Sequence, residues 1–456
     1  MDSSTSVTVT QKEQMMVEQQ VFQIYSLFAD LPPNSQSFML EIQRDSHIDY
    51  LTNGLRGLGS SFCVLDANRP WLCYWILHSL ALLEESIDEE LENNAIDFLS
   101  RCEDPNGGYG GGPGQMPHLA TTYAAINSLI SLGGHSSLSS INRDSVYSFL
   151  RQMKQPNGGF RMHDGGEVDV RACYTAISVA SILNILDERL VEHVGDFILS
   201  CQTHEGGIAG EPGSEAHGGY TYCGIATMIL INEVRRLDVA ALLDWVVFRQ
   251  GIECGFQGRV NKLVDGCYSF WQGGVSALLQ RSYPIISGLV ASESEEYSDA
   301  DSTLSATSDI PECEHAATGG SSLQGDNEAC HNNPEGARDP SAPTNLNDVG
   351  HNFLEWKASM GPPFNPMALQ QYILLCSQLQ EGGFRDKPGK SRDFYHTCYC
   401  LSGLSACQYS WSGDLGSQPA PQAILGPYSN LLEPIHPLYN IVLKKYHEAR
   451  DFFSST

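Results

Sequence analysis

The sequence predicts an all-α fold, in which helical hairpins repeat around a ring as an α/α toroid. The first observation is a turn of two glycines and an apolar residue, which recurs at intervals of about 48 to 51 residues over its first four copies. The second is a bulky apolar residue nine positions before each turn. The third is an aromatic residue fifteen positions after the second turn residue in four of the five copies. The turns are Gly107-Gly108-Tyr109, Gly158-Gly159-Phe160, Gly206-Gly207-Ile208, the degenerate Cys254-Gly255-Phe256 and Gly382-Gly383-Phe384.

Each repeat is predicted to contain a helix, the glycine turn, a loop of about ten residues and a second helix. Segments 145–154 and 120–132 have apolar residues at helical spacing, and paired glycines end a helix by allowing positive φ. No segment shows the sustained alternation of a strand. A polar residue follows ten positions after each second turn residue, namely His118, Asp169, His217, Asp265 and Asp393. An open superhelix also fits the repeat, but only a closed ring would bring these side chains together on one rim, so the toroid is favoured.

The repeat also predicts the domain organisation. Residues 1–50 are expected to be an N-terminal helical extension, 51–290 the toroid repeats, 351–430 the final repeats and 431–456 a C-terminal tail. Between the repeats, residues 291–350 are rich in Ser, Asp, Glu, Gly, Asn and Pro, which is typical of a disordered acidic insertion.

Composition excludes several classes of function. The 456 residues contain 26 Lys and Arg against 54 Asp and Glu, a net charge of −28. A strongly acidic chain is a poor binder of nucleic acid or of an anionic membrane. The polar start and the lack of a long apolar run lead us to expect a soluble, cytoplasmic protein. In such a reducing compartment the 14 cysteines are expected to be buried thiols, with one or two ligands among them.

Three side chains from two repeats form a candidate metal site. Asp265 and Cys267 flank a glycine at a predicted loop-to-helix junction, and His396 lies at the matching position of the last repeat. Carboxylate, thiolate and imidazole are the ligands of catalytic zinc sites that keep one position open. Cys398 and Cys400 are rival ligands, and a capping Asp beside a packed Cys is the alternative interpretation.

A small basic cluster lies just upstream. Arg259 and Lys262 are three residues apart and share a helical face, with Tyr268 and His217 close in the register. Such a set in an acidic chain indicates an anionic ligand, most simply a phosphate or diphosphate. The alternative is that the two cations are ordinary solvated helix charges.

Aromatic residues recur where the second helices begin. Most aromatic residues at helical spacing belong to a core, but a toroid has a central hole that some rings must line. Trp71 and Trp75 also share one helical face. Rings beside a basic cluster suit a ligand with a long apolar tail and a charged head. The aromatic candidates from the repeats are Tyr174, Tyr220, Tyr222, Trp271 and Tyr399.

Five segments together resemble the protein prenyltransferase beta subunits, and among them the farnesyltransferase type. They are RPWLCYWILHSL (69–80), GGEVDVRACY (165–174), EAHGGYTYCG (215–224), GRVNKLVDGCYSFW (258–271) and KPGKSRDFYHTCYCLSGLS (387–405). The similarity runs from about residue 60 to about residue 410 outside the insertion, and a long acidic insertion is similar to that of the plant members. The resemblance implies a prenyltransferase toroid that pairs with a separate alpha subunit.

The resemblance also implies roles for individual residues. It implies Zn²⁺ on Asp265, Cys267 and His396, the same three residues that the repeat register selects. It implies that the chain transfers farnesyl from farnesyl diphosphate to the cysteine of a C-terminal CaaX tail (Cys-aliphatic-aliphatic-X). The residues implied to bind the diphosphate are His217, Arg259, Lys262 and Tyr268, and those implied to contact the isoprenoid are Arg171, Tyr174, Tyr220, Cys223 and Trp271. The residues implied to line the substrate pocket are Trp71, Trp75, Tyr395 and Tyr399. Asp386 is implied to bind Mg²⁺, and Lys390 is a further basic position.

Three other functions were weighed. A geranylgeranyltransferase type I beta subunit would share fold and zinc chemistry, but Trp71 beside Tyr399 is expected to shorten the pocket for a 15-carbon chain. A terpene cyclase shares the toroid, but its Asp-x-Asp-Asp motif is absent from the sequence. A helical-repeat scaffold would not need the Asp-Cys-His set.

Overall fold

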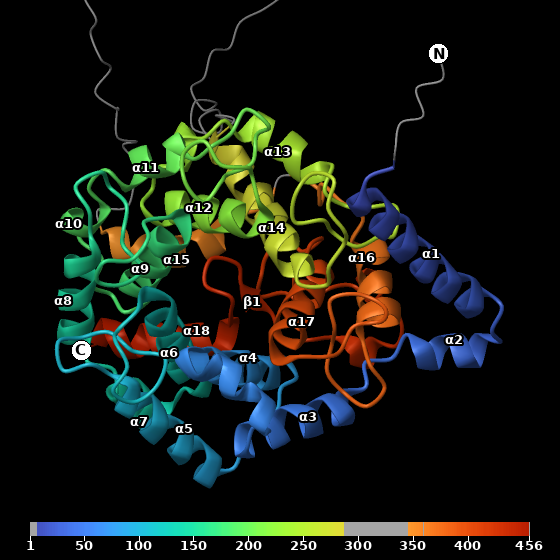
Figure 1. Cartoon of the computed structure of the whole chain (residues 1–456), viewed down its shortest axis with the longest axis horizontal. Helices are drawn as coiled ribbons and strands as arrows, with labels where there is room; N and C mark the ends of the chain where they lie inside the picture. Colours follow the sequence, from blue (N-terminus) through green and yellow to red (C-terminus); the bar gives the residue numbers. More distant parts are fainter. Residues whose placement is uncertain (1–6, 287–344, 359, 456) are drawn as a thin grey trace, which may run out of the picture.

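Helices in two concentric layers form a closed ring in the computed structural model of the chain, which describes residues 7–286, 345–358 and 360–455 (Figure 1). Within these ranges each helix of the inner layer packs against the next, and the last packs against the first. This closure distinguishes a toroid from an open superhelix. The inner helices are α4 (Arg69–Leu82), α6 (Leu119–Leu132), α9 (Val170–Ile182), α12 (Gly218–Leu230), α14 (Tyr268–Ile286) and α17 (Phe394–Gln408).

The outer layer has the amphipathic pattern that the sequence predicts. In α8 (Arg143–Met153), for example, Val146, Phe149, Leu150 and Met153 are buried and the intervening side chains face outward. The inner helices are buried on nearly all sides because they contact both neighbours and the outer layer. The other outer helices are α3 (Arg44–Arg56), α5 (Glu89–Cys102), α11 (Val194–Ser200), α13 (Val239–Val247) and α16 (Pro366–Tyr372), which continues as a π-helical turn, η6 (Ile373–Ser377).

Short helices connect these layers. They are α7 (Gly134–Ser139), α10 (Glu188–Val191) and α15 (Val349–Asn352), and the 3₁₀ turns η1 (Ser60–Asn68), η2 (Val234–Arg236), η4 (Leu346–Asp348), η5 (Phe353–Glu355), η7 (Pro421–Ala423) and η8 (Tyr428–Asn430). Residues 291–344 of the predicted insertion lie outside the described residues. Of its last residues, 346–350 belong to η4 and the start of α15, and Asn345 caps η4.

The glycine turns adopt the positive φ that the sequence predicts. The first glycine has φ between +88° and +101° in four repeats, and Cys254 takes φ +74° in the fifth. A Cβ on Gly107 would collide with the backbone carbonyl of Ser145 in the next outer helix. Close approach of the next repeat therefore requires glycine there, as well as the turn itself.

One backbone hydrogen bond recurs at five junctions between repeats. The donor is the backbone N–H twelve residues after the first residue of a glycine turn; Arg69 takes this place before the first turn. The acceptor is the carbonyl four residues after the first residue of the next turn. The bonds are Arg69 N to Gly111 O (3.0 Å), Leu119 N to Met162 O (2.7 Å), Val170 N to Gly210 O (3.0 Å), Gly218 N to Gly258 O (2.8 Å) and Gly266 N to Asp386 O (2.7 Å). The starts of five of the six inner helices, α4, α6, α9, α12 and α14, are therefore tied to the following repeat, which fixes the rim there.

The C-terminal segment corrects one prediction. Residues 431–456 are not a tail outside the toroid: β1 (Ile435–His436) and β2 (Ile441–Val442) form a buried hairpin inside one end of the ring, followed by α18 (Leu443–Ser455). Figure 1 shows β1 near the centre. The repeated tyrosines hold this segment, because the hydroxyls of Tyr123, Tyr174 and Tyr222 donate to the carbonyls of Tyr439 (3.0 Å), Leu438 (2.9 Å) and Pro437 (2.7 Å). The segment therefore closes this end of the central hole.

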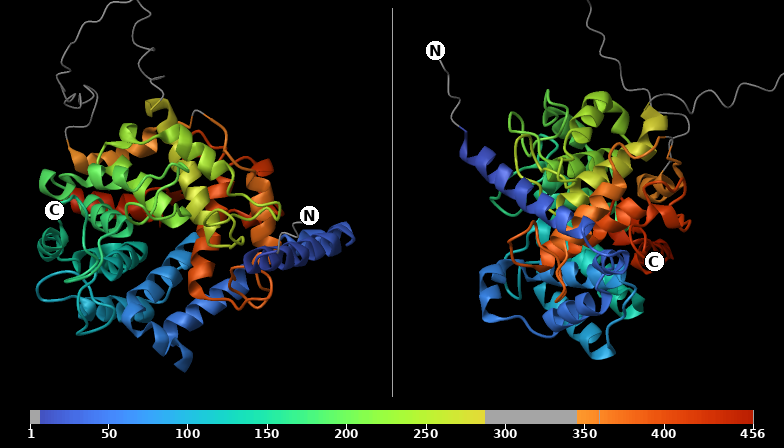
Figure 2. Two further views of the ribbon diagram at one scale, coloured as in Figure 1. Left: turned by 45° about the horizontal axis from the view of Figure 1, so that its top comes forward. Right: turned by 90° about the vertical axis from the view of Figure 1, so that its right-hand side faces the viewer.

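Helices α1 (Val9–Ala29) and α2 (Pro33–Met39) lie on the outside of the ring (Figure 2). Thr8 and Gln11 form a capping box at the start of α1. Val17 and Val21 pack against Val264 and η6 in a small second core. This contact places α1 behind the loop that carries Asp265.

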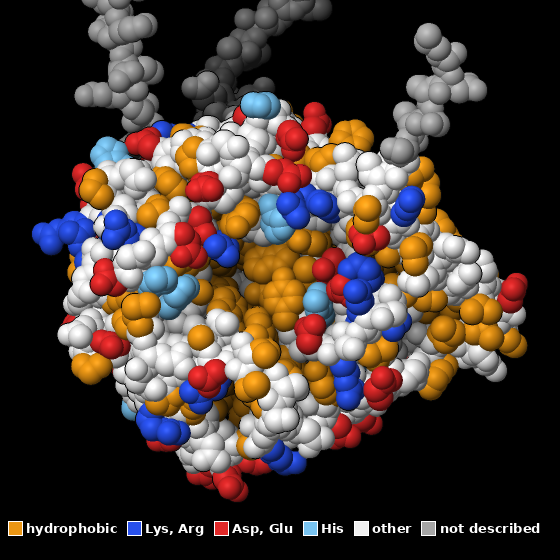
Figure 3. Space-filling model, in the orientation of Figure 1, with side chains coloured by type: hydrophobic (Ala, Val, Ile, Leu, Met, Phe, Trp, Pro, Cys, Tyr) orange, Lys and Arg blue, Asp and Glu red, His pale blue; other side chains and the backbone are white. Residues whose placement is uncertain are grey.

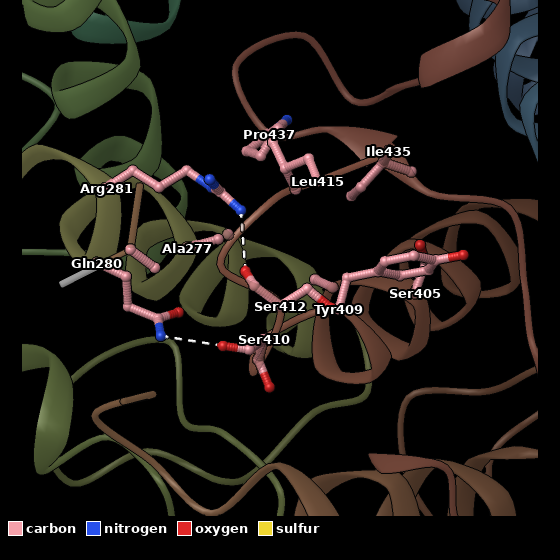
Figure 4. A pocket seen from close by; sticks show the side chains of 13 residues that line it. Ala277, Gln280, Arg281, Ser405, Tyr409, Ser410, Ser412, Leu415, Ile435 and Pro437 are labelled. Atoms are coloured by element: carbon pink, nitrogen blue, oxygen red, sulfur yellow. Dashed lines mark hydrogen bonds between the residues drawn. The ribbon is translucent and has the colours of Figure 1, made fainter. Parts of the chain in front are cut away.

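A small cavity lies between the C-terminal ends of α14 and α17 (Figure 4). Gln280 donates to Ser410 O and Met360 O, and Arg281 donates to Ser412 O and Trp356 O. These bonds satisfy both buried side chains and brace the crossing segments. The cavity is therefore part of the structural packing and is separate from the rim where α14 and α17 begin.

Two sequence-based expectations concern cysteines and membranes. All twelve cysteines within the described ranges have free thiols. Among the described helices, none has the length and apolar character needed to cross a bilayer.

Candidate metal centre and adjoining cavity

The recurring polar residues are helix N-caps on one rim of the ring. His118, Asp169, His217 and Asp393 each accept a backbone N–H with the side chain at the start of their inner helix. Asp265 does the same for Cys267 N at 2.9 Å, just before α14. These residues therefore share two features: each side chain caps an inner helix, and all five lie on one rim of the ring. The N-terminal ends of the inner helices add positive potential there.

Asp265, Cys267 and His396 come together as predicted. One ligand atom from each lies within 4.8 Å of the other two. Within the part of the chain that the structure describes, this set of His, Cys and Asp side chains is close enough together to hold a metal ion. The ligand-bearing loops belong to neighbouring repeats and are joined by the Gly266–Asp386 hydrogen bond. The rival thiols Cys398 and Cys400 are buried deeper in α17 and lie outside this group.

The His396 ring is oriented by an acid that the sequence analysis treated only as part of the polar column. Its Nδ1 donates to Asp393 Oδ2 at 2.7 Å, which leaves the lone pair of the neutral ring on Nε2. Nε2 lies 3.2 Å from Asp265 Oδ1 without hydrogen-bond alignment, and it is buried with no hydrogen-bond partner. Nε2 faces the two other ligands, so once its proton is lost it can hold a cation between them.

The protonation of the three groups reflects their crowding. Burial lowers the pKa of His396, but the nearby carboxylates of Asp265 and Asp393 outweigh it and raise the pKa to about 9, so the ring is protonated at neutral pH without a metal. Burial, with Asp265 beside it, raises the pKa of the Cys267 thiol well above its usual value. A divalent cation would reverse both effects, because it favours thiolate and neutral imidazole.

His217 and Tyr268 form a hydrogen-bonded pair next to this cluster. His217 Nδ1 accepts from Gly219 N at 3.0 Å, so the neutral ring carries its proton on Nε2, which donates to the Tyr268 hydroxyl oxygen at 3.0 Å. Burial and the nearby Arg259 lower the pKa of His217 to about 4, which keeps the ring neutral. The Tyr268 hydroxyl proton is therefore available to another acceptor.

The two predicted cations lie at the rim in the loop before α14, and not on the shared helical face that their spacing predicts. Arg259 is half-exposed and pairs with Glu215 at 3.1 Å, and Lys262 is exposed. Neither is confined to the packing of the ring. The pairing with Glu215 is a feature that the sequence analysis missed.

An apolar hollow opens in the middle of this face, with His, acidic and basic side chains around it (Figure 3). The predicted aromatic residues at the starts of α14 and α17 form a chain of ring contacts with Trp75 of α4. Trp271 and Tyr399 have centroids 4.6 Å apart, Tyr399 and Tyr395 4.8 Å, and Tyr395 and Trp75 5.5 Å. The Trp271 indole N–H also donates to the Tyr395 hydroxyl at 3.1 Å.

Two further predicted pocket residues, Trp71 and Tyr174, lie on α4 and α9. Trp71 packs against Trp75 (5.7 Å) and Tyr123 (5.7 Å), and Trp75 in turn contacts Tyr395. Tyr174 donates to Leu438 O and so helps to form the closed end of the hollow.

Arg171 lies at the start of α9, and Tyr220 and Cys223 lie in the first turns of α12, where the Tyr220 ring contacts His217 (5.3 Å between centroids). Arg171 forms an ion pair with the capping Asp169 and lies over the Tyr220 ring, 5.5 Å from its centroid. Cys223 is buried, and burial raises the pKa of its thiol.

The predicted magnesium position is close to the metal cluster. The Asp386 carboxylate forms an ion pair with Lys387, a partner that the sequence analysis missed, although it is the adjacent residue. The Asp386 carbonyl accepts from Gly266 N. Lys390 is exposed, and its N–H donates to Lys387 O at 3.3 Å.

Comparisons with known proteins agree on a single family. Residues 42–441 match the family described as the prenyltransferase alpha-alpha toroid domain. The chain is 60% identical to protein farnesyltransferase subunit beta of Pisum sativum over the full length of both, and 56% identical to that of Arabidopsis thaliana over 99% of this chain and 91% of the relative. Geranylgeranyl transferase type-1 subunit beta of Arabidopsis thaliana is 30% identical over 54% of this chain and 75% of its own length.

A solved structure shows the same fold. It is the Candida albicans protein geranylgeranyltransferase-I complexed with GGPP, with a TM-score of 0.59, 20% identity, and coverage of 90% of this chain and 99% of that chain. Together with the full-length identities, the toroid and its rim show that the chain belongs to the protein farnesyltransferase subunit beta family.

Proposed function

We propose that the chain, paired with an alpha subunit, transfers the farnesyl group of farnesyl diphosphate to the cysteine thiol of a CaaX tail. The observation that carries this proposal is the cluster of Asp265, Cys267 and His396, next to the aromatic residues Tyr395 and Trp271. The names of the full-length relatives support the reaction class.

The donor set fits Zn²⁺. A carboxylate, a thiol and an imidazole make three protein ligands, and catalytic zinc sites keep a fourth position for substrate. The buried, unpartnered Nε2 of His396, oriented by Asp393, supports a cation at this point. When bound, Zn²⁺ lowers the pKa of a thiol that enters the fourth position, so that the thiol is present as thiolate.

The reaction joins this thiolate to C1 of farnesyl diphosphate. A C–S bond forms while the C1–O bond breaks, and the electron pair leaves with the diphosphate. Negative charge grows on the leaving oxygens, where the Tyr268 hydroxyl, Arg259 and Lys262 stabilise it. Because His217 Nε2–H donates to the Tyr268 oxygen, it aims the hydroxyl proton away from itself and toward the diphosphate.

The aromatic hollow suits the isoprenoid. The residues proposed to contact the isoprenoid chain are Arg171, Tyr174, Tyr220, Cys223 and Trp271. The residues proposed to contact the end of the isoprenoid and the CaaX tail are Trp71, Trp75, Tyr395 and Tyr399. Burial of apolar surface contributes about 25 cal/mol per Å², so a 15-carbon chain supplies much of the binding free energy. A geranylgeranyl transferase is the second candidate, supported by the likeness to the type-1 subunit. The much higher identity to farnesyltransferase subunits favours the first.

Mg²⁺ is proposed to bind with the diphosphate at Asp386. Mg²⁺ typically takes one or two carboxylates together with substrate phosphate oxygens. The Asp386 carboxylate is already paired with Lys387, so the cation and this ammonium group compete for it. Lys390 is a further basic group on the same loop. A cytoplasmic location fits thiols that remain reduced.

The decisive experiment co-expresses the chain with a candidate alpha subunit and measures transfer of radiolabelled farnesyl to a CaaX peptide. We expect transfer that stops with a zinc chelator and returns with added zinc, and no transfer to the peptide with Ser in place of Cys. Transfer that persists after complete zinc removal would contradict the metal role. A steady preference for geranylgeranyl diphosphate in competition would favour the second candidate.

A further inference from the structure

Tyr372 departs from the repeat pattern next to the metal cluster. The residues ten positions before the first turn residue are Asp97, Ser148, Asp196 and Asp244 in the other repeats, and all four are exposed. Tyr372 occupies this register in the last repeat and is 0% exposed. It ends α16, directly before the π-helical turn η6, an irregularity that often occurs at functional sites.

The buried Tyr372 side chain reaches the junction between the ligand-bearing loops. Its hydroxyl donates to the Asp386 carbonyl at 3.1 Å, and the same carbonyl accepts from Gly266 N at 2.7 Å. Its ring packs under the Cys254–Gly255 turn, since a Cβ on Gly255 would lie 3.0 Å from it. Tyr372 therefore touches both the loop that leads to Asp265 and the loop that leads to His396.

Little room for adjustment exists around Gly266, which lies between the ligands Asp265 and Cys267. A Cβ there would lie 2.7 Å from Cys400 Sγ, 2.9 Å from Ser377 Oγ and 3.0 Å from Arg385 O. The position of the Gly266 backbone, and with it the two flanking ligands, depends on the carbonyl to which its N–H donates. Tyr372 fixes that carbonyl from the other side.

We propose that Tyr372 is a positioning residue of the metal centre, whose hydroxyl holds the Asp386 carbonyl so that Asp265 and Cys267 stay in register with His396. The inference rests on the proposed metal site. Groups that orient metal ligands typically change metal affinity 10–100-fold when they are removed, because a misplaced ligand loses geometry at the ion. Tyr372 itself touches neither substrate nor metal.

The test compares Tyr372→Phe with Tyr409→Phe in the heterodimer. Tyr409 is a matched control, since its buried hydroxyl also donates to a single backbone carbonyl, Leu432 O at 3.1 Å, near the opposite end of α17. Zinc affinity is measured by chelator competition, and the Co²⁺-substituted proteins are compared by their thiolate-to-cobalt absorption band. Melting temperatures with and without zinc report affinity even where a variant is less stable.

We expect Tyr372→Phe to bind zinc at least about 10-fold more weakly and to shift the cobalt band, while Tyr409→Phe keeps the wild-type affinity and band. Equal affinity and an unchanged band in Tyr372→Phe would overturn the inference while the metal site stands. An equal loss in both variants would also overturn it, because the effect would then be general destabilisation. A wild-type protein that binds no zinc would instead refute the proposed function.

Discussion

Asp393 Oδ2 accepts a hydrogen bond from His396 Nδ1 at 2.7 Å, while Asp393 Oδ1 accepts from His396 N at 2.7 Å. One carboxylate therefore caps α17 and also orients the imidazole that faces Asp265 and Cys267. A capping residue of the repeat therefore has a second role at the candidate metal centre. His217 likewise has two roles, because it caps α12 and orients Tyr268.

Asp393→Asn should weaken zinc binding about 10-fold while the helix start is retained. Asparagine also caps helices well, but its neutral amide is a poorer partner for the imidazole N–H. Zinc affinity by chelator competition and helix content by circular dichroism measure the two effects separately. Unchanged affinity in Asp393→Asn would show that the orientation of His396 does not depend on the carboxylate.

Tyr268→Phe should lower kcat more than it weakens the binding of farnesyl diphosphate. The phenol hydrogen bond strengthens as charge develops on the leaving diphosphate, so its loss is expected to cost about 10²-fold in kcat. Single-turnover rates and equilibrium binding of farnesyl diphosphate separate the two quantities. Equal losses in kcat/KM and in ground-state affinity, with kcat unchanged, would assign Tyr268 to binding alone.

Three buried histidines should make stability depend on pH. Burial lowers the pKa of His78 and His436 to about 3 and of His47 to about 4, with Arg44 and Arg392 adding to the effect at His47. The unfolded chain takes up these protons near pH 6.5, so the stability they contribute is complete above that pH and is lost as the pH falls toward 4. Each histidine is expected to lower the free energy of unfolding by about 1.4 kcal/mol when the pH falls from 7.5 to 5.5.

This dependence is measured by thermal unfolding of the heterodimer at both pH values. His78→Gln should reduce the shift in unfolding free energy by about 1.4 kcal/mol relative to wild type. The exposed His204 provides a control variant, His204→Gln, in which the shift should stay at the wild-type value. An identical shift in wild type and His78→Gln would show that His78 does not titrate on unfolding.

Cys254→Gly should stabilise the protein. Cys254 holds φ +74° where four other repeats have glycine, and a side chain in this region costs roughly 1–2 kcal/mol. Glycine removes that cost but raises the entropy of the unfolded chain, which leaves a net gain of about 0.5–1 kcal/mol. Chemical denaturation measures it, and a lower stability would indicate that the thiol packing near Tyr25 outweighs the backbone strain.

Much of the fold could be predicted because the repeat carries local signals. The glycine turns, the apolar positions before them and the capping column lie at fixed spacings, so the candidate metal ligands Asp265, Cys267 and His396 could be aligned across repeats separated by the insertion. Positive φ and capping are properties of a few neighbouring residues, and these are visible in a sequence.

The features that were missed depend on contacts between distant segments. The clamp of Tyr123, Tyr174 and Tyr222 on the C-terminal carbonyls joins residues more than 200 positions apart, and backbone acceptors carry no residue signature. The residues 431–456 therefore read as a tail. The ion pair of Arg259 with Glu215 and the role of Tyr372 likewise depend on how loops of adjacent repeats meet.

The metal content of purified heterodimers tests the central claim most directly. Elemental analysis of wild type, Cys267→Ala and Cys400→Ala distinguishes the predicted ligand from the neighbouring buried thiol. We predict one zinc in wild type and in Cys400→Ala, and neither zinc nor farnesyl transfer in Cys267→Ala. Full zinc occupancy in Cys267→Ala would contradict the assignment of this site.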